Sequence, residues 1–134
     1  MAATKHRKPA IKLARTDHER LTLLADGFAD RNPAVADALL AELDRAGVVD
    51  DKRLAADTIR MGSRLTYATS DGEERTVTLV YPADADISAG KISILTPIGA
   101  ALIGLSTGQS IDWEARDGKT HRLNIEKVWP PEGQ

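Results

Sequence analysis

The residue types that could perform chemistry are few in this chain and widely separated. There is no cysteine, which excludes disulfides, zinc–thiolate sites and thiol catalysis. The three histidines, His6, His18 and His121, lack the spacing of metal ligands. Asp84 and Asp86 lie two apart in a polar stretch, which suits a cation, but turn-forming aspartates that bond their own backbone give the same pattern. The sequence therefore identifies no catalytic residue, no metal site and no cofactor.

The sequence also lacks the motifs for nucleotide binding and for acyl transfer by a serine nucleophile. No GxxxxGK phosphate-binding loop is present. Ser63, Ser93 and Ser110 do not stand in the sequence context of an activated nucleophile. We therefore expect a protein that is not an enzyme.

Charge is unevenly distributed along the chain. The net charge is −2, yet residues 1–16 carry five basic residues and no acid. We expect a basic flexible tail over residues 1–15 that lies in solvent, since short charge runs usually do. Contact of this tail with nucleic acid is the alternative interpretation, and no other segment is expected to bind nucleic acid. The remainder is mildly acidic, which argues against nucleic acid as its main partner, because phosphate neutralisation needs clustered Lys and Arg. No apolar run approaches the ~18 residues of a membrane span and no secretory signal is present, so a cytoplasmic location is expected.

The N-terminal third has the pattern of two helices. Thr16 and Glu19 fit a capping box at the start of the first helix, and Asn32 followed by Pro33 fits the start of the second. Gly47 is a suitable residue to end the second helix. The apolar residues fall at helical spacing, namely Leu21, Leu24, Ala25 and Phe28, then Val35, Leu39 and Leu43. We predict a short antiparallel hairpin over residues 16–56, with helices of about 14 residues and about 21 Å each.

The C-terminal part has the alternation of strands. Strands are predicted over residues 63–69, 75–81, 91–95, 109–114 and 121–128, with hairpin turns at Asp71-Gly72 and Asp117-Gly118. Thr96 and Pro97 predict the start of one short helix, which Gly104 ends. The fold class is therefore α+β, a helical hairpin followed by a twisted antiparallel sheet with one short helix.

Five segments carry a resemblance to two known families. TPIGAALIGLSTGQ (residues 96–109) resembles the C-terminal signature of the Gre transcription elongation factors, as do LVYPADADISAGKISILTP (79–97) and IRMGSRLTYATSDGEERTVTLV (59–80). ADALLAELDRAGVV (36–49) and the WPPE end are similar to the regulator of nucleoside diphosphate kinase family. The resemblance implies an FKBP-like fold over residues 57–134. It also implies binding of RNA polymerase near its secondary channel, in competition with Gre factors, and a link to nucleoside diphosphate kinase.

The resemblance also implies which residues contact the polymerase. These are the residues of the signature turn, Thr96, Pro97, Ile98 and Gly99, with Asp86 as a weaker candidate. The Gre signature usually has Ser in place of Thr96, which changes little because both can cap a helix. It usually ends with an acid in place of Gln109, which puts in question any contact that depends on that charge. Trp113 and Trp129 are expected to cover the sheet rather than bind a partner.

Gre factors place acids at the tip of a long coiled coil to help hold a second metal ion for transcript cleavage. The candidate tip residues here are Asp30 and Arg31, so one acid stands next to a cation. Solvated helix charges are the more ordinary interpretation of such residues. Because the hairpin is also short, we expect no stimulation of cleavage.

The sequence is compatible with two other functions. An FKBP-like fold suggests a prolyl isomerase, but one Phe, two Trp and two Tyr are too few to predict an aromatic proline pocket. A protein-interaction module of this fold with a different partner is the main alternative. No oligomerisation signal is present, so a monomer is expected.

Overall fold

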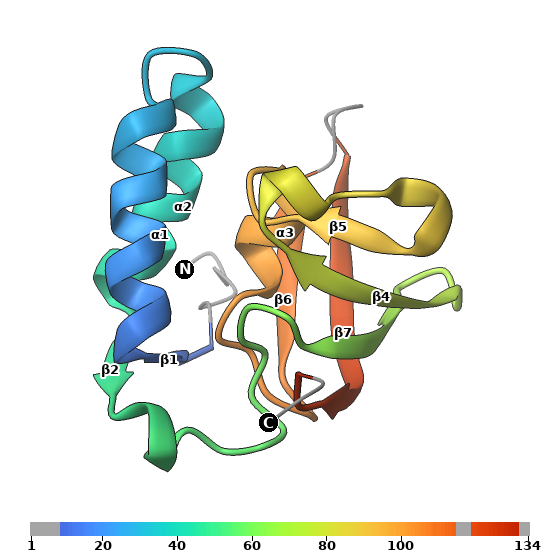
Figure 1. The fold of residues 1–134 in the computed structure, drawn as a ribbon. Helices are drawn as coiled ribbons and strands as arrows, with labels where there is room; N and C mark the ends of the chain where they lie inside the picture. Colours follow the sequence, from blue (N-terminus) through green and yellow to red (C-terminus); the bar gives the residue numbers. More distant parts are fainter. Residues whose placement is uncertain (1–8, 115–118, 132–134) are drawn as a thin grey trace, which may run out of the picture.

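The computed structural model describes residues 9–114 and 119–131, and arranges them as a pair of helices beside a sheet (Figure 1). The helices are α1 (Arg15–Phe28), α2 (Pro33–Arg45) and α3 (Pro97–Leu102). The strands are β1 (Lys12–Ala14), β2 (Gly47–Val49), β3 (Arg64–Thr69), β4 (Glu74–Val80), β5 (Lys91–Ser93), β6 (Ser110–Glu114) and β7 (Thr120–Trp129).

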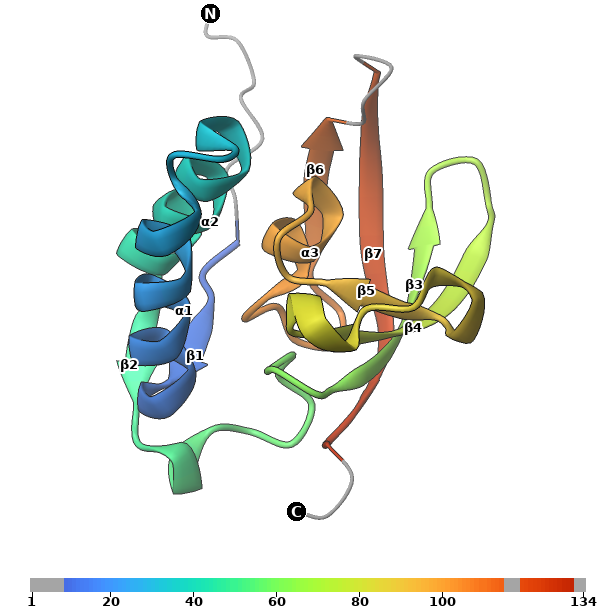
Figure 2. The same ribbon diagram turned by 45° about the horizontal axis from the view of Figure 1, so that its top comes forward.

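Helices α1 and α2 lie side by side and run in opposite directions, as both views show (Figures 1 and 2). The second helix begins as predicted, since Pro33 is its first residue and the Asn32 side chain accepts a hydrogen bond of 3.3 Å from the Val35 N–H. Predicted apolar residues from both helices, among them Leu21, Leu39 and Leu43, are buried. Helical periodicity therefore identified much of the face that packs inward.

The predicted capping box at the start of α1 is wrong. The helix begins at Arg15 with Ala14 as N-cap, and no side chain of that residue caps it. Instead, the Thr16 N–H donates a hydrogen bond of 3.1 Å to Oδ1 of Asp51, which stands 35 residues further along the chain. A carboxylate at this end of a helix satisfies a free N–H and favours the positive end of the helix dipole.

The predicted tail over residues 1–15 differs from the structure in its last part. Strand β1 pairs in parallel with β2, from Lys12 opposite Gly47 to Ala14 opposite Val49. Ile11 and Leu13 are buried, whereas Lys12 and Arg15 are exposed. Two apolar residues in a basic stretch thus enter the core, and Gly47 belongs to β2 rather than ending a helix. The other basic residues of this segment, Lys5, Arg7 and Lys8, lie outside the described residues.

The five-stranded sheet has the order β5-β4-β3-β7-β6 and is mostly antiparallel. The prediction of a wholly antiparallel sheet is wrong at one edge, where β5 pairs with β4 in parallel. The cause is the connection over residues 81–90, which folds back through two 3₁₀ turns, Pro82–Asp84 and Ile87–Ala89. It returns the chain to Thr78, opposite Lys91, so the short β5 strand runs in the direction of β4. The second predicted turn, Asp117-Gly118, lies outside the described residues.

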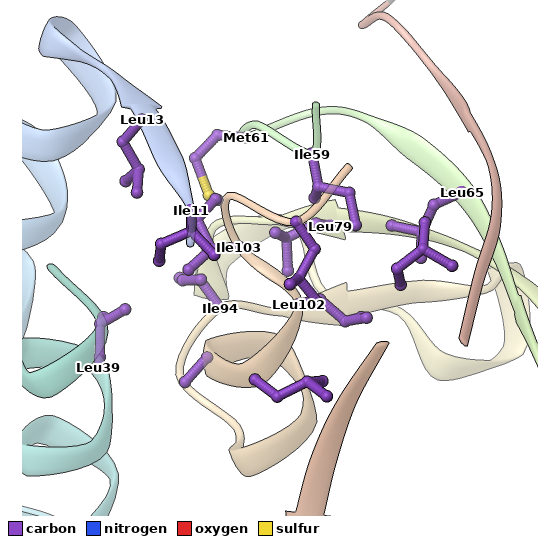
Figure 3. Packing of buried hydrophobic residues seen from close by; sticks show 14 of the residues in the cluster. Ile11, Leu13, Leu39, Ile59, Met61, Leu65, Leu79, Ile94, Leu102 and Ile103 are labelled. Carbon is purple, nitrogen blue, oxygen red and sulfur yellow. The ribbon is translucent and has the colours of Figure 1, made fainter. Parts of the chain in front are cut away.

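One hydrophobic core joins the hairpin to the sheet. Helix α3 lies between the hairpin and the sheet (Figure 2). Buried residues from β1, α2, β4 and α3 gather in one cluster, which includes Ile11, Leu13, Leu39, Leu79 and Leu102 (Figure 3). Since no boundary divides this cluster, the hairpin and the sheet are expected to unfold together.

Replacing Leu13 by Ala tests the shared core. Leu13 is 2% exposed, and loss of a buried leucine side chain costs about 2–5 kcal/mol. We expect urea unfolding of Leu13→Ala, followed by circular dichroism, to shift to lower urea in one cooperative transition. Lys12→Ala, at the exposed neighbour in the same strand, serves as the control and should unfold like the parent protein. Two separate transitions in the parent protein would contradict a single core.

Candidate functional site

The turn before α3 has the local structure that the sequence predicts. The Thr96 hydroxyl oxygen accepts a hydrogen bond of 3.0 Å from the Gly99 N–H and donates one of 2.7 Å to the Ser93 carbonyl. Pro97 occupies the first helical position, where its missing N–H has no cost. Thr96, Pro97 and Ile98 are all half-buried, so each presents part of its side chain at the surface.

Gly99 lies inside the same turn, whereas the three residues before it are partly exposed. It is buried, and a Cβ atom there would stand 2.3 Å from the Ser93 carbonyl oxygen and 3.0 Å from the Ile94 Cα. Only glycine fits this close approach of two backbone segments. Gly99 therefore shapes the turn, and the surface of the turn comes from Thr96, Pro97 and Ile98.

Asp86 lies at the other end of β5. Its carboxylate accepts hydrogen bonds of 3.1 Å from the Ser88 N–H and 2.6 Å from the Ser88 hydroxyl. The Ser88 hydroxyl is the main reason why the pKa of Asp86 is lowered. Asp86 also pairs through its backbone with Lys91, the first residue of β5, while Thr96 follows the end of that strand. A three-residue strand, about 10 Å long, thus separates the two predicted contact points.

Ile87, beside Asp86, was not predicted as a site residue. Its side chain is 91% exposed, the highest value among the exposed large apolar residues. The available signal was an isoleucine within the polar stretch ADADISAG. An isolated exposed apolar residue is ordinary on a protein surface, so this signal was weak without the structure.

The tip of the hairpin holds Asp30 and Arg31, both exposed. The turn is closed by hydrogen bonds from the Arg31 and Asn32 N–H groups to the Phe28 carbonyl, at 3.0 and 3.1 Å. The tip lies at the end of the hairpin that is remote from β1 and β2 (Figure 1). Within residues 9–114 and 119–131, no three His, Asp or Glu side chains gather to hold a metal ion.

A buried carboxylate joins α1 to the sheet. Asp17 is 6% exposed, and its Oδ2 accepts a hydrogen bond of 3.0 Å from the Met61 N–H. Burial raises the pKa of Asp17, while the Met61 hydrogen bond and the nearby Arg60 oppose this. Asp17 lines a cleft of 510 Å³ between α1 and the sheet, together with charged side chains that include Arg20, Lys52, Arg60, Asp51 and Asp84. This cleft was not predicted, because its residues come from five segments that are separated in the sequence.

Gln109, the departure from the Gre signature, has a structural role here. Its side-chain oxygen accepts a hydrogen bond of 2.8 Å from the Ser106 N–H, and its side-chain nitrogen donates one of 2.9 Å to the Ala10 carbonyl. An ionised carboxylate could accept the first bond but has no proton for the second. The amide thus ties the segment before β1 to the sheet.

Comparisons with known proteins match the N-terminal and C-terminal parts of the chain to two separate family models. A model of the family "Transcription elongation factor, GreA/GreB, C-term" matches residues 54–130, and one of "Rnk N-terminus" matches residues 9–49. The structure is similar to that of a GreA/GreB elongation factor from Nitrosomonas europaea, with a TM-score of 0.72 and 40% sequence identity. That match covers 91% of this chain and 99% of the other. Fold and sequence thus define a transcription factor with a Gre-type C-terminal domain.

Two relatives show which family of Gre-type transcription factors the chain belongs to. The regulator of nucleoside diphosphate kinase from Escherichia coli K12 is 41% identical over 127 residues, which cover 93% of each chain. The GreA factor of Rhodospirillum rubrum is 38% identical over 115 residues, covering 81% of this chain and 73% of the relative. The chain belongs to the regulator of nucleoside diphosphate kinase family, as its sequence motifs predicted.

These relatives are regulators and elongation factors by name. Of the helices in the described part of the chain, none combines the length and the apolar character that crossing a membrane would require.

The buried Asp17 should make stability depend on pH. Its pKa is raised in the folded protein, so its stabilising effect is complete below the unfolded value near 3.8 and is lost as pH rises through the folded pKa. Asp17→Asn should keep an acceptor for the Met61 N–H and remove this loss. In urea titrations across that pH range, its stability relative to the parent protein should rise with pH.

Asp17→Ala separates the hydrogen bond from the charge. It leaves the buried Met61 N–H without its acceptor, which costs about 1–3 kcal/mol. We expect Asp17→Ala to be less stable than Asp17→Asn at every pH of the titration. Equal stability of the two variants would show that the Asp17–Met61 bond does not hold α1 to the sheet.

Proposed function

We propose that this protein is a transcription regulator that binds RNA polymerase near its secondary channel through residues 57–134. It modulates Gre-type elongation factors or competes with them, and does not itself stimulate transcript cleavage. The observation that carries the proposal is the Thr96–Pro97 turn. It is capped, partly exposed, and lies within the segment matched by the GreA/GreB C-terminal family model.

The surface we assign to docking follows from side-chain exposure. Thr96, Pro97 and Ile98 form its centre, with Gly99 holding the turn in shape from below. Asp86 belongs to its margin, because Ser88 already occupies the Asp86 carboxylate and a strand separates it from the turn. The FKBP-like description of this domain, which the family resemblance implies, is part of the same proposal.

We propose that the hairpin, which the sequence predicts over residues 16–56, occupies the mouth of the channel. Helices α1 and α2 have 14 and 13 residues, or about 20 Å of length. At its tip, Asp30 is the one acid and Arg31 is its neighbour. Holding a catalytic Mg²⁺ needs carboxylates that converge with substrate phosphates, which a single acid beside a cation does not supply.

The family name records a link to nucleoside diphosphate kinase. We propose that this link runs through transcription, since the likeness to elongation factors supports a polymerase partner and no kinase contact is needed. The protein would then act in the cytoplasm as a monomer and without enzymatic activity. Binding to a different protein partner through the same fold is the competing outcome.

Pro97→Arg tests the docking surface. A bulky cation at the centre of the turn should weaken binding to purified core polymerase about tenfold or more, as loss of a central interface residue does. Pro97→Ala, which removes the helix-starting proline without adding bulk, should bind more tightly than Pro97→Arg. Both variants must give the circular dichroism spectrum of the parent protein. Parent-level binding by folded Pro97→Arg would remove this turn from the proposal.

A cleavage assay tests the role of the hairpin. Polymerase arrested on a template should keep its transcript at full length when this protein is added. A Gre factor, added to a parallel sample, should shorten the transcript, and this protein should reduce that shortening by competing for the polymerase. Shortening by this protein alone would contradict the proposed absence of cleavage activity.

A further inference from the structure

The face of the sheet opposite α3 carries a cluster of cations around one indole ring. Strand register aligns Lys91, Thr78, Arg64 and Trp129 in one row across β5, β4, β3 and β7. The adjacent row consists of Thr76, Thr66 and Lys127. We call these seven residues the outer-face cluster. The helices cover the other face of the sheet (Figure 2), and every member of the cluster is exposed or half-buried.

The members of the cluster contact one another. The Arg64 guanidinium carbon lies 5.3 Å from the centre of the Trp129 ring, and the Lys127 ammonium nitrogen lies 4.8 Å from it. The Thr66 and Thr76 hydroxyl oxygens are 2.8 Å apart. These contacts hold two cations at the indole and line the next row with hydroxyl groups.

The outer-face cluster has an excess of positive charge. Its two rows contain three cations and no carboxylate, whereas the chain as a whole has a net charge of −2. In the described part of the chain, Arg64 and Lys127 form no ion pair, so their charge is available to an anionic partner. Lys91 forms no ion pair there either, but it lies near the Asp86 carboxylate and helps to lower the pKa of that group, so it is the weakest of the three cations toward a partner.

We propose that the outer-face cluster binds single-stranded nucleic acid. Sheet faces that combine basic side chains with an aromatic ring bind single strands, because phosphates contact the cations and bases stack on the ring. Arg64 and Lys127 would contact phosphates, and the Thr hydroxyls would add hydrogen bonds to phosphate or sugar. One base would stack on the Trp129 indole by displacing the Arg64 or the Lys127 side chain that lies over the ring. This proposal does not depend on polymerase binding.

The size of the cluster limits the strength of the interaction. Four strands, at about 4.8 Å spacing, give the first row a width of about 14 Å, enough for a few nucleotides. Three cations neutralise at most three phosphates, so the logarithm of the affinity should fall with the logarithm of salt with a slope of about −2. With an acidic remainder, the protein should bind weakly and at low salt.

A protein segment rich in Asp and Glu is the competing partner, because carboxylates also pair with Arg and Lys. Trp129 favours nucleic acid, since a base can stack on an indole and a carboxylate cannot. The basic residues before Pro9 form a second competing explanation, as a charged tail can also attract phosphates. Both are distinguished by variants of the full chain.

The experiment measures fluorescence anisotropy of a labelled single-stranded oligouridine of about 12 nucleotides at about 50 mM salt. The parent protein should bind with the salt slope given above. Arg64→Ala/Lys127→Ala should bind at least tenfold more weakly, with the slope reduced to about −0.7. Trp129→Phe should weaken binding less and lose the quenching of indole fluorescence that the oligonucleotide causes in the parent protein.

The matched control is Lys12→Ala/Arg53→Ala, which removes two exposed cations from β1 and the connecting segment. It should bind like the parent protein. Unchanged binding by Arg64→Ala/Lys127→Ala, an equal loss in the control, or no binding by the folded parent protein would overturn the proposal. Equally tight binding of a polyglutamate peptide would also overturn it, by assigning the cluster to acidic protein segments.

Discussion

The packing of β1 between the hairpin and the sheet is the interaction on which the rest of the structure depends. Ile11 and Leu13 are buried in the core that both parts share. Gly104 permits this packing, because a Cβ atom there would stand 2.9 Å from the Ile11 Cβ, and its φ of +83° also favours glycine. Without this contact the hairpin would keep only the packing of α2 on α3, and the direction of its tip relative to the α3 turn would be less well defined.

Hydrogen bonds around this core fix the orientation of the segments that pack in it. Asp17 bonds the Met61 N–H, Asp51 bonds the Thr16 N–H, and Gln109 bonds the Ala10 carbonyl. Each of these contacts joins segments at least 35 residues apart, so together they hold the hairpin at a defined angle. A hydrophobic core alone tolerates sliding, whereas a hydrogen bond fixes the relative position of its two partners, most strongly at the buried Asp17–Met61 contact. The proposed docking turn and the hairpin tip are thereby presented to a partner in a defined arrangement.

Short sequence motifs predicted the helices and most strands. The features that they did not predict depend on contacts between segments far apart in the sequence. Asn32 and Thr96 cap helices as predicted, because a cap acts within three residues of itself. The cap of α1 was missed because Asp51 comes from a distant segment, and the parallel edge strand was missed because its return loop carries no such signature. For the candidate site, sequence motifs located the α3 turn, but the burial of Gly99 and the exposure of Ile87 required the structure.

The outer-face cluster depends on an irregularity in β7 that keeps the core intact. Leu123, Ile125 and Val128 are all buried, although strict alternation would place Val128 on the face opposite the other two. A bulge reconciles them, since Tyr67 pairs with Ile125 while Thr66 pairs with Lys127, leaving Glu126 as the extra residue. The same shift puts Lys127 and Trp129 on the outer face, beside Arg64. The filled core and the charged outer face therefore both depend on the extra residue of this bulge, and removing Glu126 would disturb both faces together.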